Sequence, residues 1–258
     1  MMEINKLIPA PEIRNWTGPF DDTEYYLNLG KEQAEKIIQW LSIKPEQKIL
    51  DIGCGCGRIA IHFLNYLNEQ GKYIGIDSNK LLLSYCEDNI STVNNNFQFE
   101  FVDAYNGAYS RDGKLKCQDI VFPVENESVD TVIMWSVFTH MYLADIDAYL
   151  KEIHRVLKKG GLFISSFNLY NKFIENQIKT DKAYLNINYK INEASYTLDK
   201  ETPEGGFAHD EEKIKDLYWE NGFFIREIKY GIWSSKELAG EFHDCIIAEK
   251  LEDCLLPK

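Results

Sequence analysis

The stretch Lys48-Ile-Leu-Asp-Ile-Gly-Cys-Gly-Cys-Gly-Arg-Ile-Ala60 places glycine at every second position after a short apolar run. The apolar run before Gly53 is typical of a strand that is covered on both faces. Glycine tolerates positive φ and lets the backbone lie against a ligand. Apolar residues at helical spacing then predict a helix over 57–69, whose free N–H groups point back at the turn. Strand, glycine turn and helix together indicate the first crossover of a nucleotide-binding sheet.

The rest of the chain repeats this alternation of strand and helix. Lys158-Lys-Gly-Gly161 is expected to cap one of the helices at its C-terminus. Five alternations favour an α/β fold, a doubly wound parallel sheet with helices on both faces. The predicted strands span 72–77, 97–103, 129–135, 162–167, 223–230 and 244–250, and the predicted helices span 31–41, 79–89, 144–157 and 210–221.

Composition narrows the class of partner. The 258 residues carry a formal net charge of -13. Because phosphate groups bind basic surfaces, this charge argues against a nucleic acid and against an anionic membrane surface. The N-terminus, Met1-Met-Glu-Ile-Asn-Lys6, has no apolar signal core, and no apolar run is long enough to span a bilayer, so we expect a cytoplasmic protein. The six cysteines lack paired zinc spacing, so no metal site is expected.

Acidic residues end three consecutive predicted strands, at Asp51, Asp77 and Asp103. The carboxyl ends of these strands meet at one edge of the sheet, where open α/β sheets bind ligands. A nicotinamide cofactor expects G-x-G-x-x-G, whereas here the third glycine comes one residue too early and an acid precedes the first. The ammonium group of S-adenosylmethionine suits Asp51, its ribose hydroxyls suit Asp77, and its adenine amino group suits Asp103. Each acid alone could equally be a turn or helix-cap residue.

Longer motifs extend this reading. Leu50-Asp-Ile-Gly-Cys-Gly-Cys-Gly-Arg58, Ile74-Gly-Ile-Asp77, Phe101-Val-Asp-Ala104, Ser128-Val-Asp-Thr-Val-Ile-Met134 and Leu150-Lys-Glu-Ile-His-Arg-Val-Leu-Lys-Lys-Gly-Gly161 follow one another in order. Together they resemble the motifs of the class I S-adenosylmethionine-dependent methyltransferases, over about residues 30–250. The resemblance implies a Rossmann-like seven-stranded sheet of order 3-2-1-4-5-7-6, with strand seven antiparallel, in a single methyltransferase domain over 1–258.

The same resemblance implies S-adenosyl-L-methionine as the cofactor and S-adenosyl-L-homocysteine as the product. The residues expected to bind this cofactor are Asp51, Gly53, Gly55, Gly57, Asp77, Ser78, Asp103, Ala104 and Trp135.

A narrower likeness concerns the segments outside the sheet. Residues 14–20, 53–60, 136–141 and 230–233 are similar to a bacterial group of small-molecule methyltransferases. Residues 1–30 are then expected to form a lid, although a flap that only covers apolar surface is an equal alternative. A polar segment over 170–207, with a hairpin near 184–198, is expected as an insertion near the substrate pocket. The side chains expected to face the substrate are Arg14, Trp16, Tyr25, Tyr26, His209 and Tyr230.

His140 is the candidate general base, because it follows the fourth predicted strand at the place where the methyl group should lie. Its alternative role is that of a polar residue at the start of the next helix. Arg58 is expected on the cofactor side or in a buried ionic contact. Strand four ends in Met134-Trp135 rather than in an acid, so the magnesium site of catechol-type enzymes is not matched.

The pattern predicts a methyltransferase that acts by in-line displacement on a small molecule, and it favours oxygen over nitrogen as the acceptor atom. Neither a Pro-Pro-aromatic tetrapeptide nor a Pro-Cys pair follows strand four, which argues against nucleic-acid amine and cytosine methylation. The alternatives are a protein or RNA methyltransferase, a non-catalytic S-adenosylmethionine-binding module, and a nicotinamide oxidoreductase. The sequence leaves the oligomeric state open.

Overall fold

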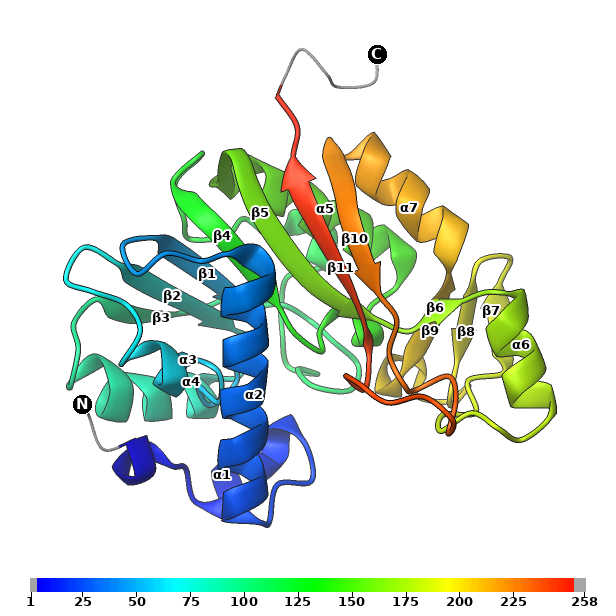
Figure 1. Ribbon diagram of the computed structural model, residues 1–258, viewed down its shortest axis with the longest axis horizontal. Helices are drawn as coiled ribbons and strands as arrows, with labels where there is room; N and C mark the ends of the chain where they lie inside the picture. The colour runs from blue at the N-terminus through cyan, green and yellow to red at the C-terminus, as the bar shows by residue number, and fades with distance from the viewer. Residues whose placement is uncertain (1–3, 253–258) are drawn as a thin grey trace.

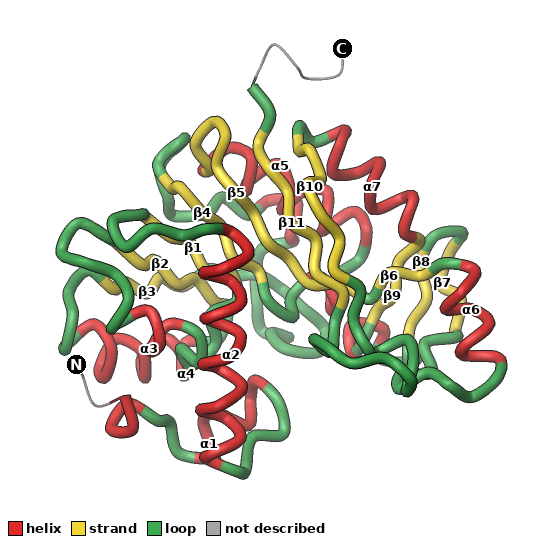
Figure 2. The backbone as a smooth tube through the Cα atoms, viewed as in Figure 1, coloured by secondary structure: helices red, strands yellow, loops and turns green. Residues whose placement is uncertain are grey.

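The computed structural model describes residues 4–252. Its main feature is a seven-stranded sheet of order β10-β11-β5-β4-β1-β2-β3, drawn in yellow in Figure 2. Strands β1 to β5 run parallel, whereas β11 runs antiparallel to both β5 and β10. The predicted strand order 3-2-1-4-5-7-6 is therefore confirmed. The strands are β1 (Lys48–Ile52), β2 (Lys72–Asp77), β3 (Phe97–Phe101), β4 (Val129–Met134), β5 (Leu157–Phe167), β10 (Phe223–Lys229) and β11 (Asp244–Lys250).

Helices cover both faces of this sheet, and an apolar core fills each side (Figure 1). Leu50 and Ile52 of β1 point into the core shared with α5 and α7, whereas Ile49 points into the core shared with α2 and α3. This division follows from the alternation of side chains along a strand. The helices are α1 (Pro11–Arg14), α2 (Thr23–Leu41), α3 (Ala60–Phe63), α4 (Lys80–Cys86), α5 (Leu143–Val156), α6 (Lys172–Lys179) and α7 (Glu211–Glu220).

Several predicted boundaries were wrong. Helix α2 begins at Thr23 rather than at residue 31, because the Asp22 carboxylate accepts a hydrogen bond from Tyr25 N at 2.9 Å and caps it. The helix predicted over 57–69 is α-helical only in α3. Strand β5 begins at Leu157, so the expected helix cap over 158–161 is part of the strand, where Gly160 adopts a φ of 71°.

The segment predicted as an insertion forms a second, small sheet beside the first (Figure 1). The predicted hairpin is confirmed, since β7 and β8 pair antiparallel. Buried Asp244 joins the two sheets by accepting a hydrogen bond from Leu169 N at 2.7 Å, and it also accepts one from Trp233 Nε1 at 2.7 Å. The strands are β6 (Leu169–Tyr170), β7 (Tyr189–Asn192), β8 (Ser195–Thr197) and β9 (Phe207–Asp210), in the order β6-β9-β8-β7.

Six single-turn or tight helices complete the described chain: η1 (Ile4–Leu7), η2 (Asn15–Thr17), η3 (Glu87–Ser91), η4 (Cys117–Asp119), η5 (Phe138–His140) and η6 (Pro203–Gly205). Within residues 4–252, none of the helices has both the length and the apolar character needed to cross a membrane.

Candidate functional site

A cavity opens at the carboxyl ends of β1, β2 and β4, where parallel sheets bind their ligands. Its walls come from the strand ends, from the loop after β3 and from the N-terminal segment around Trp16 and Thr17. The sequence-predicted residues that line it are Trp16, Asp51, Gly53, Gly55, Asp77, Ser78, Ala104, Trp135 and His140.

The glycine turn adopts left-handed backbone at each of its glycines. Their φ angles are 76° at Gly53, 56° at Gly55 and 80° at Gly57. A Cβ added at Gly53 would lie 2.4 Å from Val137 Cγ2, and one at Gly55 would lie 2.7 Å from Thr17 Cγ2. The N-terminal segment therefore lies directly on the turn. Gly57 does not line the cavity, because it faces Ile90 and Cys86 instead, so its expected cofactor contact is not supported.

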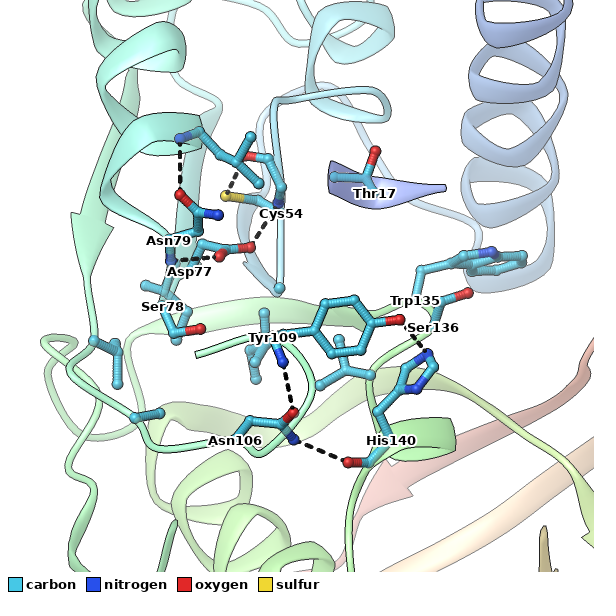
Figure 3. A pocket seen from close by; sticks show the side chains of 18 of the residues that line it. Thr17, Cys54, Asp77, Ser78, Asn79, Asn106, Tyr109, Trp135, Ser136 and His140 are labelled. Carbon is cyan, nitrogen blue, oxygen red and sulfur yellow. Dashed lines mark hydrogen bonds between the residues drawn. The ribbon is translucent and has the colours of Figure 1, made fainter. Parts of the chain in front are cut away.

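Asp77 lies at the end of β2 with both carboxylate oxygens oriented by backbone donors. Oδ2 accepts from Gly55 N and Oδ1 accepts from Asn79 N, each at 2.8 Å (Figure 3). A carboxylate oxygen has two acceptor positions, so each oxygen can accept one more hydrogen bond. Burial raises the pKa of Asp77, although these backbone donors oppose the shift. The side chain can thus receive a pair of hydroxyl donors.

Asp51 is buried in β1, where the Tyr73 hydroxyl donates to its Oδ2. Burial raises the pKa of Asp51 to about 7. A cationic ligand group beside this carboxyl would favour the ionised form, because an opposite charge stabilises a buried carboxylate.

Asp103 is not among the residues that line the cavity, whereas its neighbours Val102 and Ala104 are. Its Oδ1 accepts a hydrogen bond from Lys114 N at 3.3 Å in the loop that follows β3. The expected adenine contact of Asp103 is therefore not supported, and the Ala104 backbone takes its place at the cavity wall.

His140 lies at the other end of the cavity, in η5. Its Nδ1 is 2.8 Å from the carbonyl oxygen of Glu204, and its Nε2 is 3.3 Å from the Tyr109 hydroxyl (Figure 3). A carbonyl can only accept, so Nδ1 carries the proton and Nε2 presents a lone pair. Burial lowers the pKa of His140. The imidazole is thus neutral, with its basic nitrogen toward the cavity.

Of the side chains expected to face substrate, Trp16 lines the cavity and the other five do not. Arg14 is buried, because its guanidinium donates to the backbone of the N-terminal segment at Phe20, Pro9 and Asp21. The expected substrate contacts of Arg14, Tyr25, Tyr26, His209 and Tyr230 are therefore not supported by the cavity lining.

Contacts within the protein explain why three of these side chains do not line the cavity. The Tyr26 hydroxyl lies 3.3 Å from Cys56 Sγ, in a small core beneath the turn. His209 is buried, with Nδ1 3.0 Å from Ser195 Oγ and Nε2 3.0 Å from the Met141 carbonyl oxygen. The Tyr230 hydroxyl donates to Glu211 at 2.7 Å. Each polar atom has a partner within the protein.

Arg58 lines the cavity and contacts helix α2. Its Nη1 donates to Gln33, and its guanidinium carbon lies 5.0 Å from the centre of the Phe20 ring. Its buried Nε has no hydrogen-bond partner among residues 4–252. A buried guanidinium with an unused donor suits a ligand carboxylate.

Sequence reasoning missed the contribution of the loop after β3. Tyr105, Asn106 and Tyr109 line the cavity, and the Asn106 side chain donates to the carbonyl oxygen of His140 at 3.0 Å. The signal was present, because a long connection directly after a ligand-binding strand end is more often functional than accidental.

The sheet order and the acid-lined glycine turn at its carboxyl edge define a class I S-adenosylmethionine-dependent methyltransferase. A family model described as "Methyltransferase domain" matches residues 43–222, and the chain belongs to this family. S-adenosylmethionine is its cofactor.

Curated relatives agree on the chemistry and differ in the acceptor. The chain is 28% identical over 145 residues to a demethylmenaquinone methyltransferase of Lactobacillus johnsonii, a match that covers 55% of this chain and 53% of that protein. The chain thus spans about half the length of that relative. It is also 29% identical over 196 residues to the protein-lysine N-methyltransferase EFM4 of Saccharomyces cerevisiae, covering 70% and 82% of the two chains.

Solved structures agree on the fold. A methyltransferase from Methanosarcina mazei matches with a TM-score of 0.57 at 23% identity, covering 84% of this chain and 98% of that one. The magnesium protoporphyrin IX methyltransferase of Synechocystis PCC 6803, solved with bound S-adenosylhomocysteine, matches with a TM-score of 0.57 at 14% identity, covering 96% and 98%.

Proposed function

We propose that this methyltransferase methylates an oxygen atom of a small molecule, with His140 as the general base. The observation that carries the proposal is the fixed tautomer of His140. The Glu204 carbonyl holds the proton on Nδ1, so Nε2 carries the lone pair that can accept a proton from a hydroxyl that replaces the Tyr109 hydroxyl there.

The donor end of the cavity supports the placement of the cofactor. When bound, S-adenosylmethionine supplies an electrophilic methyl group on a sulfonium. Asp51 would hold its ammonium group, Asp77 its ribose hydroxyls and Arg58 its carboxylate, while Ala104 would contact the adenine. The positions of all four at the cavity wall, together with the spare acceptors and donors described above, fit this assignment.

The acceptor end supports oxygen chemistry. A hydroxyl is a weak nucleophile until it loses its proton, and a well-placed base contributes about 10²–10⁴-fold to such a step. The lowered pKa keeps His140 unprotonated near neutral pH. Alignment of the hydroxyl with the methyl group supplies a further part of the rate acceleration.

The lid and the insertion each contribute a group to this site. Trp16 and Thr17 of the N-terminal segment form one wall of the cavity, and Glu204 of the inserted segment orients His140. These contacts support our proposal that residues 1–30 and 170–207 form a functional unit with the sheet.

A protein acceptor is the second candidate, because the similarity to the yeast protein-lysine methyltransferase covers 82% of that chain. The lining argues against it. Among the residues that the structure describes, the acids of the lining are Asp51 and Asp77, both assigned to the cofactor, so none of these carboxylates remains to neutralise a lysine ammonium.

Isotope transfer tests the acceptor class. The purified protein is incubated with S-adenosylmethionine that carries a labelled methyl group, together with separated small-molecule, protein and RNA fractions of a cell extract. We expect label in the small-molecule fraction. Label transferred only to protein or RNA would contradict the proposal.

A further inference from the structure

The position next to the base is already occupied by an aromatic hydroxyl of the chain itself. The Tyr109 hydroxyl lies 3.3 Å from His140 Nε2, and the two rings meet edge to face with centroids 4.7 Å apart. Figure 3 shows the Tyr109 ring lying across the pocket with its hydroxyl directed at the imidazole. Because Nδ1 carries the ring proton, the hydroxyl of Tyr109 is the donor. The site thus displays the geometry in which His140 receives an aryl hydroxyl.

The ring of Tyr109 is free to leave this position. Its backbone is fixed independently, because Asn106 Oδ1 accepts from Tyr109 N at 3.1 Å while Asn106 Nδ2 donates to the His140 carbonyl oxygen. The Tyr109 residue is 47% exposed, so its ring can rotate to solvent without opening a buried core. A ligand that replaces it needs to break only the hydroxyl's bond to Nε2 and the ring contact.

Further aromatic side chains line the same cavity. Trp16 and Tyr105 line the same cavity although they are 52% and 48% exposed, and they come from segments far apart in the sequence. Exposed aromatic rings that line one cavity indicate a site for an apolar or planar ligand. Among residues 4–252, the charged residues of the lining are Asp51, Asp77 and Arg58, which are the three proposed to bind the cofactor. An acceptor carrying its own charge would be desolvated there without a counter-charge.

We infer that the methyl acceptor is a neutral aryl hydroxyl compound whose oxygen takes the place of the Tyr109 hydroxyl against His140 Nε2. The inference rests on the proposed function and specifies its substrate class. In the transfer, the hydroxyl proton passes to His140 Nε2 and the oxygen forms the new bond to the methyl carbon. The bond from that carbon to sulfur breaks with its electron pair on sulfur, so the sulfonium becomes the neutral thioether of S-adenosylhomocysteine.

Binding of three matched probes tests the inference: a naphthol, the corresponding naphthoate and the corresponding naphthylmethylamine, which is a cation at neutral pH. Each is titrated by calorimetry into protein saturated with S-adenosylhomocysteine. We expect Tyr109→Ala to bind the naphthol about tenfold more tightly than the wild type does, since the ring no longer competes. Tyr109→Phe, which keeps the ring and loses the hydroxyl, should show an intermediate gain.

The two charged probes should bind the wild type and both Tyr109 variants at least about tenfold more weakly than the naphthol does. Equal or tighter binding of either charged probe would overturn the inference, as would the absence of any gain in both Tyr109 variants. S-adenosylhomocysteine binding is measured first in each protein. Its absence from the wild type would count against the proposed function, whereas its presence with a failed probe series counts against the aryl hydroxyl alone.

Discussion

At the scale of single residues, His140 contacts the inserted segment through Glu204 and the loop after β3 through Tyr109. We expect His140→Ala to lower turnover by about 10²–10⁴-fold with little change in S-adenosylhomocysteine affinity, because the base acts on the acceptor. The pKa of His140 lies below its ordinary value, so the acid limb of the turnover profile should lie below about pH 6.5. Stopped-assay turnover across pH measures both effects. Wild-type turnover in His140→Ala would remove the residue from the mechanism.

The acids at two neighbouring strand ends form a matched pair of variants. Asp77 lines the cavity and Asp103 does not. Asp77→Ala should weaken S-adenosylhomocysteine binding by about 1.5–3 kcal/mol, as expected for hydrogen bonds to a charged group, and Asp103→Ala should have a smaller effect. Calorimetric titration of both variants gives the comparison. Because Asp77→Ala also loses the hydrogen bond from Gly55 N, thermal unfolding of each variant checks that the fold is intact. Equal losses in the two variants would show that the cavity does not mark the ribose site.

Asp51 gives cofactor binding a pH dependence. Its pKa is raised to about 7 in the free protein, so the carboxyl holds its proton below that pH. The ligand's ammonium group favours the carboxylate, so binding below about pH 7 releases a proton and affinity falls as the pH drops. Calorimetry of S-adenosylhomocysteine binding in buffers of different protonation enthalpy should detect the released proton. Asp51→Asn should abolish the release, and an identical release from that variant would place its source elsewhere.

At the scale of elements, the glycine turn between β1 and α3 depends on its backbone conformation. Gly53→Ala forces a side chain into left-handed backbone, at about 1–2 kcal/mol, and places its Cβ against Val137. We expect cofactor affinity to fall by at least about tenfold. Gly205→Ala is the control, because no atom lies within 4 Å of the added Cβ and its φ is not positive. Normal cofactor binding by Gly53→Ala would show that cofactor binding does not depend on the backbone conformation at Gly53.

Element boundaries show where sequence patterns stop being informative. The buried strands were predictable, because apolar runs such as 72–77 fit only a covered strand. The ends of helices were not. The cap at Asp22 and the strand start at Leu157 depend on single hydrogen bonds and on pairing with β4, which no local pattern specifies.

At the scale of the whole molecule, most residues proposed to bind the cofactor were predicted to lie together, whereas the surroundings of His140 were not predicted. Asp51, Gly53 and Asp77 are brought together by the strand order alone. The loop after β3 and the inserted segment both contact His140, and they come together only when the chain folds. Exposed aromatic residues such as Tyr25 and Tyr230 look the same in sequence as Tyr109, and only the fold brings Tyr109 to His140.

The position of the transferred methyl group tests the central claim most directly. The small-molecule product formed from S-adenosylmethionine with an isotope-labelled methyl group is isolated, and the NMR shift of that group identifies the atom that carries it. The proposed role of His140 predicts a methyl group bonded to oxygen. A methyl group bonded to nitrogen or carbon would contradict it.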